Sequence, residues 1–199
     1  RYDLSAPLSR FVAENFRELV FPYKRFAYGN VFRQEKADSA RFRSFAQLDA
    51  DIIGDADPAQ ADAEICNIIV DSFLNCGLKK DQFSINISNK KILQGLINEI
   101  NIEESKQYKL LKSIDKLDRL GLKGVEELLK YGRKDQSGAF TKGCELSNDQ
   151  ASQILSFLSL KNLKDLKSNL KNPLSLEGIN EIEKLLEIMS FGKNENYIN

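Results

Sequence analysis

The chain has 199 residues, with 29 basic and 29 acidic side chains, no histidine, three cysteines and 42% hydrophobic residues. This length and apolar content are enough to bury one large core or two small ones, and the zero net charge excludes a uniformly basic coat for nucleic acid. Because histidine is absent, the chain by itself cannot assemble Ser-His-Asp or Cys-His catalysis or a histidine-ligated metal site.

The cysteine spacing and the lack of a membrane or signal segment predict the protein's cellular location. Cys66, Cys76 and Cys144 are odd in number and lack CxxC spacing, so we expect reduced thiols in a cytoplasmic protein, with no zinc ribbon, disulfide framework or protein-held metal. No apolar run reaches the roughly 18 residues of a membrane span, and no signal segment opens the chain, which predicts a soluble protein without a membrane partner. A start at Arg1, within patterned sequence, predicts a fragment of a longer protein.

An antiparallel hairpin is predicted near the beginning of the chain. Aromatic, β-branched and alternating residues indicate strands at residues 25–28, 31–35 and 42–53, with a polar loop at residues 36–40 between the last two. Seven of the nine arginines and seven of the twelve phenylalanines lie within the first 45 residues. Arginine holds carboxylate or phosphate through paired hydrogen bonds, whereas lysine is a solvated point charge, so we expect anion recognition in this part of the chain.

A helix and a further strand are predicted next. Asp57 and Pro58 provide an N-cap and a first-turn proline, and apolar residues then recur at helical spacing until Gly77. Apolar and polar residues alternate over residues 83–88, which predicts a half-exposed strand.

The second half of the chain is rich in leucine, lysine, glutamate and asparagine, which predicts amphipathic helices. Residues 147–150 have the pattern of a capping box, and Ser175 is predicted to cap a later helix. Residues 132–143 are expected to form a loop between helices. The sequence therefore predicts an α+β fold in which a helical module, residues 99–199, follows a sheet-based front, residues 1–98.

The third predicted strand carries an unusual set of side chains. Side chains alternate between the two faces of a strand, and one face would present Arg41, Arg43, Phe45, Gln47, Asp49 and Asp51. The arginine end suits an anion, the ring suits a flat group and the carboxylate end suits an amine. This order predicts a ligand with a phosphate, a flat ring and an amino group, which fits an amino acid together with a nucleotide. The alternative is an ordinary exposed hairpin with cross-strand ion pairs.

Several stretches of this region can be compared with known families. They read RYDLSAPL at residues 1–8, FRQE at 32–35, RFRSF at 41–45 and QLDADIIG at 47–54. The FRQE and RFRSF pair resembles the motif 2 hairpin of class II aminoacyl-tRNA synthetases, and RYDLSAP and QLDADIIG resemble the histidyl-tRNA synthetase family. Further stretches, at residues 87–93, 114–121 and 132–135, resemble the alphaproteobacterial form of that family.

The resemblance implies part of the class II antiparallel sheet with flanking helices at residues 1–98, and a mainly helical insertion domain at residues 99–199. It implies ATP-dependent activation of histidine to histidyl-adenylate, with Mg²⁺ bound through the ATP phosphates, and transfer to tRNA(His) by a cytoplasmic enzyme that is a homodimer at full length. No counterpart of motif 1, motif 3 or the anticodon-binding domain is found, so this chain alone is expected to be inactive. The alternative is a synthetase-like regulatory subunit of ATP phosphoribosyltransferase in histidine biosynthesis.

The match with the family implies a role for individual residues. Arg33 would be the catalytic residue, bridging the ATP α-phosphate and the histidine carboxylate and stabilising the charge that builds at phosphorus. In the ATP site, Glu35 would contact the adenine amino group and Phe45 would stack on adenine, while Arg41 would contact the terminal phosphates with support from Arg43. The implied histidine-binding residues are Asp3, Leu4, Ser5, Arg33, Gln47 and Asp51.

Some positions differ from the family or have a second interpretation. Ser5 stands where the family usually has threonine, which keeps the hydroxyl but leaves it freer to rotate. The loop at residues 36–40 lacks the proline and glycine common in the family, which affects its contact with the tRNA acceptor end. Asp49 is expected to have a structural role. Residues 99–199 are expected to be solvated helices, with a surface that faces tRNA as the alternative.

Overall fold

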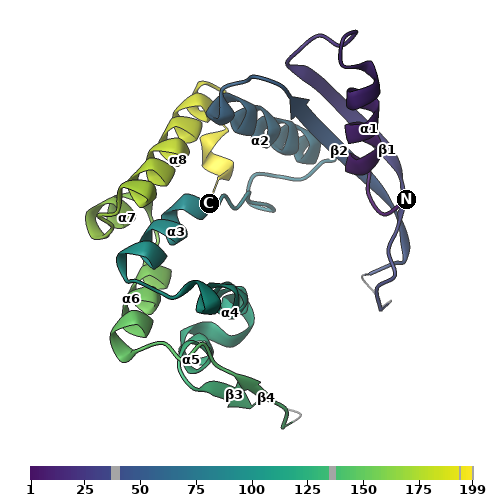
Figure 1. Ribbon diagram of the computed structural model, residues 1–199. Coiled ribbons are helices and arrows are strands. Elements are labelled where there is room, and N and C mark those ends of the chain that lie inside the picture. Colours follow the sequence, from purple (N-terminus) through teal and green to yellow (C-terminus); the bar gives the residue numbers. More distant parts are fainter. Residues whose placement is uncertain (37–40, 135–137, 193, 199) are drawn as a thin grey trace. The chain divides into compact units, whose positions relative to one another are not determined.

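The computed structural model describes residues 1–36, 41–134, 138–192 and 194–198, and Figure 1 labels its helices and strands. The chain divides into two compact units, one formed by residues 1–85 with 188–197 and the other by residues 86–187 with 198. Helices and small antiparallel sheets occur together, which confirms the predicted α+β class. The domain boundaries expected from the sequence concern the whole protein and stay a prediction.

The first unit contains the predicted hairpin. Strand β1 (Tyr23–Phe32) pairs antiparallel with β2 (Ser44–Ile53), from Tyr23 opposite Ile53 to Phe32 opposite Ser44. The separate strands expected at residues 25–28 and 31–35 are wrong, because Gly29 and Asn30 pair with β2 and continue β1 between them. Of the predicted loop, residues 37–40 lie outside the described residues.

Two helices accompany the hairpin, α1 (Ser5–Asn15) and α2 (Pro58–Asn75). The predicted N-cap of α2 is confirmed, since the Asp57 carboxylate accepts a hydrogen bond of 3.2 Å from the backbone N–H of Gln60. Ala63, Cys66 and Val70 lie on the buried face of α2, whereas Ile68 and Phe73 are exposed. Within the described part of the chain, no helix is long and apolar enough to cross a bilayer.

The strand predicted at residues 83–88 is wrong. Ile85 forms an isolated bridge, and its N–H donates to the carbonyl of Tyr197 at 2.7 Å, in the short 3₁₀ helix η1 (Glu195–Tyr197). Phe83 stacks on the Tyr197 ring at 5.1 Å and meets the Phe73 ring edge-on at 5.0 Å. The alternating apolar residues therefore contribute ring packing, because no longer strand pairs with them among the described residues.

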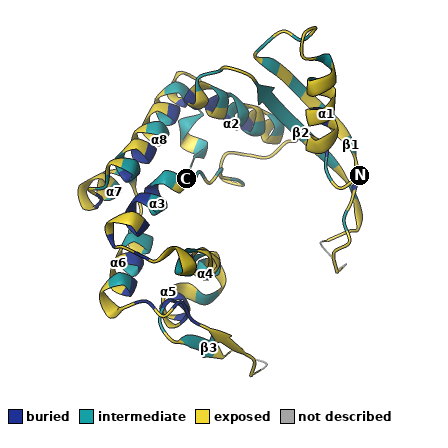
Figure 2. Ribbon diagram, in the orientation of Figure 1, coloured by how far each residue is buried: buried dark blue, intermediate teal, exposed yellow. Residues whose placement is uncertain are grey.

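The second unit is mainly helical. Its elements are α3 (Lys90–Glu99), α4 (Glu104–Ile114), α5 (Leu117–Leu129), β3 (Gly132–Lys134), β4 (Phe140–Lys142), α6 (Asn148–Ser159), α7 (Leu163–Asn169) and most of α8 (Pro173–Phe191). Their apolar sides form one core, in which Leu110, Val125, Ile154 and Ile179 are fully buried. Figure 2 colours the buried parts of these helices dark blue and their exposed parts yellow.

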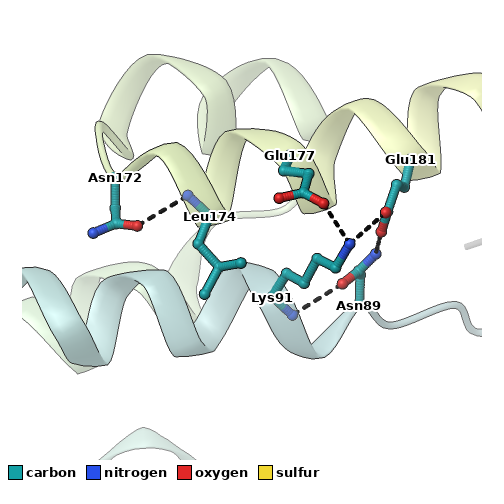
Figure 3. A network of polar contacts seen from close by, with 6 residues as sticks. All are labelled: Asn89, Lys91, Asn172, Leu174, Glu177 and Glu181. Atoms are coloured by element: carbon teal, nitrogen blue, oxygen red, sulfur yellow. Dashed lines mark hydrogen bonds and ion pairs between the residues drawn. The ribbon is translucent and has the colours of Figure 1, made fainter.

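Of three local predictions for the second unit, one is confirmed and two are wrong. The capping box is present, since Ser147 and Gln150 exchange side-chain and backbone hydrogen bonds at the start of α6. Within residues 132–143, which were expected to form a loop, β3 pairs antiparallel with β4, and residues 135–137 lie outside the described residues. Ser175 does not cap α8, because Asn172 accepts the hydrogen bond from Leu174 N–H at 3.0 Å (Figure 3) and Ser175 is buried, where it donates to the carbonyl of Ile92.

Candidate active site

One face of the hairpin carries the polar residues that the sequence predicted there. On β2, Phe45, Gln47, Asp49 and Asp51 occupy every second position and are half-buried. Arg41 and Arg43 were expected on the same strand face, but β2 begins at Ser44, so both lie outside the strand. Pairing of the Arg33 N–H with the carbonyl of Arg43 at 2.8 Å still holds the two chain segments together beyond the strand ends.

An open pocket of about 350 Å³ lies at this end of the hairpin. It is lined by Arg33, Glu35, Arg41, Phe42 and Phe45. Four of these residues belong to the predicted ATP set, while the fifth predicted residue, Arg43, is absent from the described lining and donates through Nε to the backbone carbonyl of Glu35 at 3.3 Å. Sequence reasoning missed Phe42, which adds a second ring. The pocket therefore offers two guanidinium groups, one carboxylate and two rings to a ligand.

The side chain of Arg33 is held from three directions. Its guanidinium carbon lies 5.0 Å from the ring centres of both Tyr2 and Phe45, and its Nη2 donates to Gln47 Oε1 at 3.0 Å. Its Nε is buried and has no hydrogen-bond partner among the described residues. A buried donor without a partner favours an incoming acceptor, and the strongest acceptors for a guanidinium are phosphate and carboxylate oxygens. Tyr2 had no predicted role.

Gln47 connects Arg33 with the next carboxylate along β2. The Gln47 Nε2 group donates to Asp49 Oδ1 at 2.8 Å, so the amide oxygen is the atom that faces Arg33. Asp49 thus orients Gln47, in agreement with the structural role expected for it.

Asp51 and Leu4, both expected in the histidine-binding set, meet at an arginine that sequence reasoning left without a role. Arg25 on β1 is the cross-strand partner of Asp51, and its Nη2 lies 2.9 Å from Asp51 Oδ2 and 3.1 Å from the carbonyl oxygen of Leu4. Residues 25 and 51 are distant in sequence, so this pair could be predicted only from the register of the ten-residue antiparallel strands.

The remaining histidine-set residues lie at the start of α1. Asp3 Oδ1 accepts a hydrogen bond of 3.0 Å from Ala6 N–H, Leu4 is buried, and Ser5 is the first residue of the helix. The N–H of Phe32 donates to the carbonyl of Arg1 at 2.9 Å, which ties this segment to β1. A carboxylate has further acceptor positions, so the contact of Asp3 with the helix leaves room for a ligand.

The chemistry available here uses positive charge, rings and carboxylates. Among the described residues, no group of three or more cysteine, aspartate or glutamate side chains could hold a metal ion. Arginine donors at one end and carboxylates at the other fit a ligand that is anionic at one end and a hydrogen-bond donor at the other.

Comparison with known proteins identifies the family. The family profile of histidyl-tRNA synthetases matches residues 1–172. The chain belongs to the histidyl-tRNA synthetase family. The resemblance seen in the sequence, including its alphaproteobacterial form, is therefore confirmed.

Related histidyl-tRNA synthetase sequences and structures match most of this chain. The histidine–tRNA ligase of Pelagibacter ubique is 61% identical over 194 residues, which cover 96% of this chain and 42% of that protein. The histidine–tRNA ligase of Bartonella bacilliformis is 44% identical over 201 residues, covering 96% of this chain and 40% of that protein. The chain thus spans less than half the length of these relatives.

Solved structures share the fold. The crystal structure of histidyl-tRNA synthetase from Nostoc sp. PCC 7120 has a TM-score of 0.80 and 25% identity, and the match covers the whole of this chain and 44% of that one. An ATP phosphoribosyltransferase regulatory subunit/histidyl-tRNA synthetase from Bacillus halodurans C matches with a TM-score of 0.76 at 21% identity and covers 48% of that chain, which shows a shared fold alone.

Proposed function

We propose that this chain is the part of a histidine–tRNA ligase that binds ATP and histidine and forms histidyl-adenylate. The observation that carries the proposal is the position of Arg33. It lines the pocket with Glu35, Arg41 and Phe45, and it donates to Gln47, which belongs to the proposed histidine set. One guanidinium can therefore contact both the α-phosphate and the amino-acid carboxylate.

The proposed reaction needs charge stabilisation more than proton transfer. An oxygen of the histidine carboxylate attacks the α-phosphorus of ATP, a new C–O–P bond forms, and the bond to the leaving pyrophosphate breaks. No general base is required, because the carboxylate is already ionised at neutral pH. Arg33 would stabilise the negative charge on the α-phosphate oxygens as bond order changes, and the stacked rings would fix its orientation, which is the larger part of such catalysis.

The pocket also fits the proposed cofactor. Of its described lining residues, Glu35 alone is a carboxylate, whereas Arg33 and Arg41 are cations. This donor set suits phosphate oxygens directly and leaves Mg²⁺ to be held by the phosphates, where it would neutralise the charge of the leaving pyrophosphate. Within this proposal, Glu35 contacts the adenine amino group and Phe45 stacks on adenine. Arg41 binds the terminal phosphates, with support from Arg43.

The proposal extends to the whole protein. It would transfer the activated histidine to tRNA(His) and act in the cytoplasm as a homodimer, with residues 1–98 in the catalytic core and residues 99–199 as the insertion domain. The names of the relatives support this extension. A regulatory subunit that makes no adenylate has no use for the ATP set, so the joint presence of Arg33, Glu35, Arg41 and Phe45 in one pocket favours the ligase.

The proposed activity can be tested in a full-length host. The segment of the Pelagibacter relative that matches this chain would be replaced by the chain, and exchange of radioactive pyrophosphate into ATP would be measured with each amino acid in turn. We expect exchange that depends on histidine alone. A chimera that melts at the temperature of the host, yet shows no histidine-dependent exchange, would contradict the proposal.

A further inference from the structure

Arg25 stands at the point where two distant parts of the proposed histidine site meet. It lies on β1 directly opposite Asp51 on β2, and the side chains of the two residues are 18% and 23% exposed. The third partner is the backbone of Leu4, at the beginning of α1. These three residues come from separate segments, and a single side chain connects them.

Arg25 makes a hydrogen bond with one partner and an ion pair with another. Nη2 donates its hydrogen bond to the carbonyl oxygen of Leu4 at 3.1 Å. The same nitrogen lies 2.9 Å from Asp51 Oδ2, which pairs with it by charge but accepts no hydrogen bond from any described residue. Asp51 Oδ2 is thus a buried acceptor whose negative charge is balanced and whose lone pairs are free.

The other charges around Asp51 do not alter this balance. Asp49 lies on the same face of β2 and accepts from Gln47. Lys24, next to Arg25 on β1, is paired with Glu64 of α2 at 2.6 Å. Asp3, in the segment that Arg25 ties down, holds the first turn of α1. Arg25 is therefore the group that compensates the Asp51 carboxylate.

A compensated carboxylate discriminates between two kinds of partner. A neutral N–H donor gains a hydrogen bond from the free lone pairs without meeting a repulsive charge. A second cation would gain the same hydrogen bond but would also be repelled by the guanidinium a few ångströms away. Without Arg25, the same carboxylate would instead attract a cation.

We propose that Arg25 is a positioning residue of the amino-acid site, which holds Leu4 and Asp51 together and makes Asp51 selective for the neutral imidazole N–H of histidine over a cationic side chain. This inference rests on the proposed function and adds to it a residue that selects the protonation state of the substrate.

The test is pyrophosphate exchange in the chimera described above, with KM for histidine and for ATP measured at pH 6 and at pH 8. In Arg25→Met, we expect KM for histidine to rise about tenfold at pH 8, while KM for ATP changes less than twofold. At pH 6 the ratio of variant to parent KM for histidine should be at least threefold smaller than at pH 8. More histidine is then imidazolium, which the uncompensated Asp51 attracts. Arg25→Lys, which keeps the charge, should retain the pH dependence of the parent.

Two controls separate this role from a structural one. Arg10→Met removes an exposed arginine of α1 that pairs with Glu14 and should leave both KM values unchanged. Arg25→Met combined with Asp51→Asn should abolish the altered pH dependence, since the uncompensated charge is gone. An equal rise in KM for histidine and for ATP would contradict the proposed role of Arg25, and so would a ratio of variant to parent KM for histidine that is the same at both pH values. Neither result would contradict the proposed function. A parent chimera without histidine-dependent exchange overturns the proposed function as well.

Discussion

Arg33 Nη2 donates a hydrogen bond of 3.0 Å to Gln47 Oε1 and so joins the residues proposed to bind ATP to those proposed to bind histidine. The register places Gln47 opposite Gly29, and a Cβ atom on Gly29 would lie 3.4 Å from the side chain of Leu4, which is also in the proposed histidine set. The predictions that concern activity refer to the full-length chimera.

Replacement of Arg33 by alanine should abolish histidine-dependent pyrophosphate exchange. Loss of a charge contact made in the transition state costs about 3–4 kcal/mol, or a factor of a few hundred in rate. Arg10→Ala, an exposed arginine on α1, is the matched control and should behave as the parent. Near-normal exchange by Arg33→Ala would refute the catalytic role.

Tyr2 should matter through its ring. The Arg33 guanidinium lies 5.0 Å from the Tyr2 ring centre, and a contact of this kind at a partly exposed site contributes about 0.5–1 kcal/mol. Tyr2→Leu should therefore lower kcat/KM for exchange about two- to fivefold, whereas Tyr2→Phe should keep the parent value. If Tyr2→Phe is as impaired as Tyr2→Leu, the hydroxyl and not the ring is responsible.

Asp51→Asn should weaken histidine use more than ATP use. The substitution removes the partner of Arg25 and replaces one acceptor oxygen by a donor, while the pocket lined by Arg33 and Glu35 lies at the other end of the hairpin. Steady-state KM values for both substrates measure the difference. An equal increase in the two KM values would count against a role of Asp51 in histidine selection.

Gly95 on α3 should not tolerate a side chain. A Cβ atom there would lie 2.6 Å from the backbone nitrogen of Ser175 and closer still to its hydroxyl. Gly95→Ala should reduce the free energy of unfolding by about 1–3 kcal/mol, because backbone cannot move aside as a side chain can. Gly178→Ala is the control: its Cβ would meet Ile92 and Lys91 side chains at 3.0 Å, and the better helix propensity of alanine offsets part of that cost. Denaturant unfolding of the two variants should rank them in this order.

Glu181 on α8 should stabilise the second unit in a pH-dependent manner. Lys91 and Asn89 donate to its carboxylate at 2.6 and 2.7 Å (Figure 3), and these hydrogen bonds lower the pKa of Glu181 below its ordinary value. A lowered folded-state pKa contributes stability that is fully present above the unfolded pKa of about 4.3 and is lost as the pH falls through the lower folded value.

The measurement for Glu181 is the melting temperature of Glu181→Gln. It should lie below that of the parent at pH 7, and the difference should shrink as the pH falls below the unfolded pKa of about 4.3. Glu183→Gln on the same helix, where Lys167 is the partner at 2.8 Å, should have the smaller effect at pH 7. A difference for Glu181→Gln that is independent of pH would contradict the electrostatic explanation.

Features that depend on neighbours a few residues away could be predicted from the sequence. The cap at Asp57, the capping box of Ser147 and Gln150, and the shared face of Phe45 and Gln47 follow from helix starts and strand alternation, which are local properties. Matching of contiguous motifs likewise located the pocket residues Arg33, Glu35, Arg41 and Phe45.

Contacts between groups that lie far apart in sequence could not be predicted and are seen only in the folded chain. Residues 83–88 alternate as a strand does, but Phe83 stacks on the ring of Tyr197. Ser175 is a residue type that often caps helices, but it is buried and donates to the carbonyl of Ile92. Arg25 could not be given a role from its neighbours, because its partner Asp51 is set by the register of the hairpin and its second partner, Leu4, by the docking of the chain's first residues. Strand alternation and helix caps depend on residues that are close in sequence, whereas the partner of a charged side chain is set by which distant segments pack together.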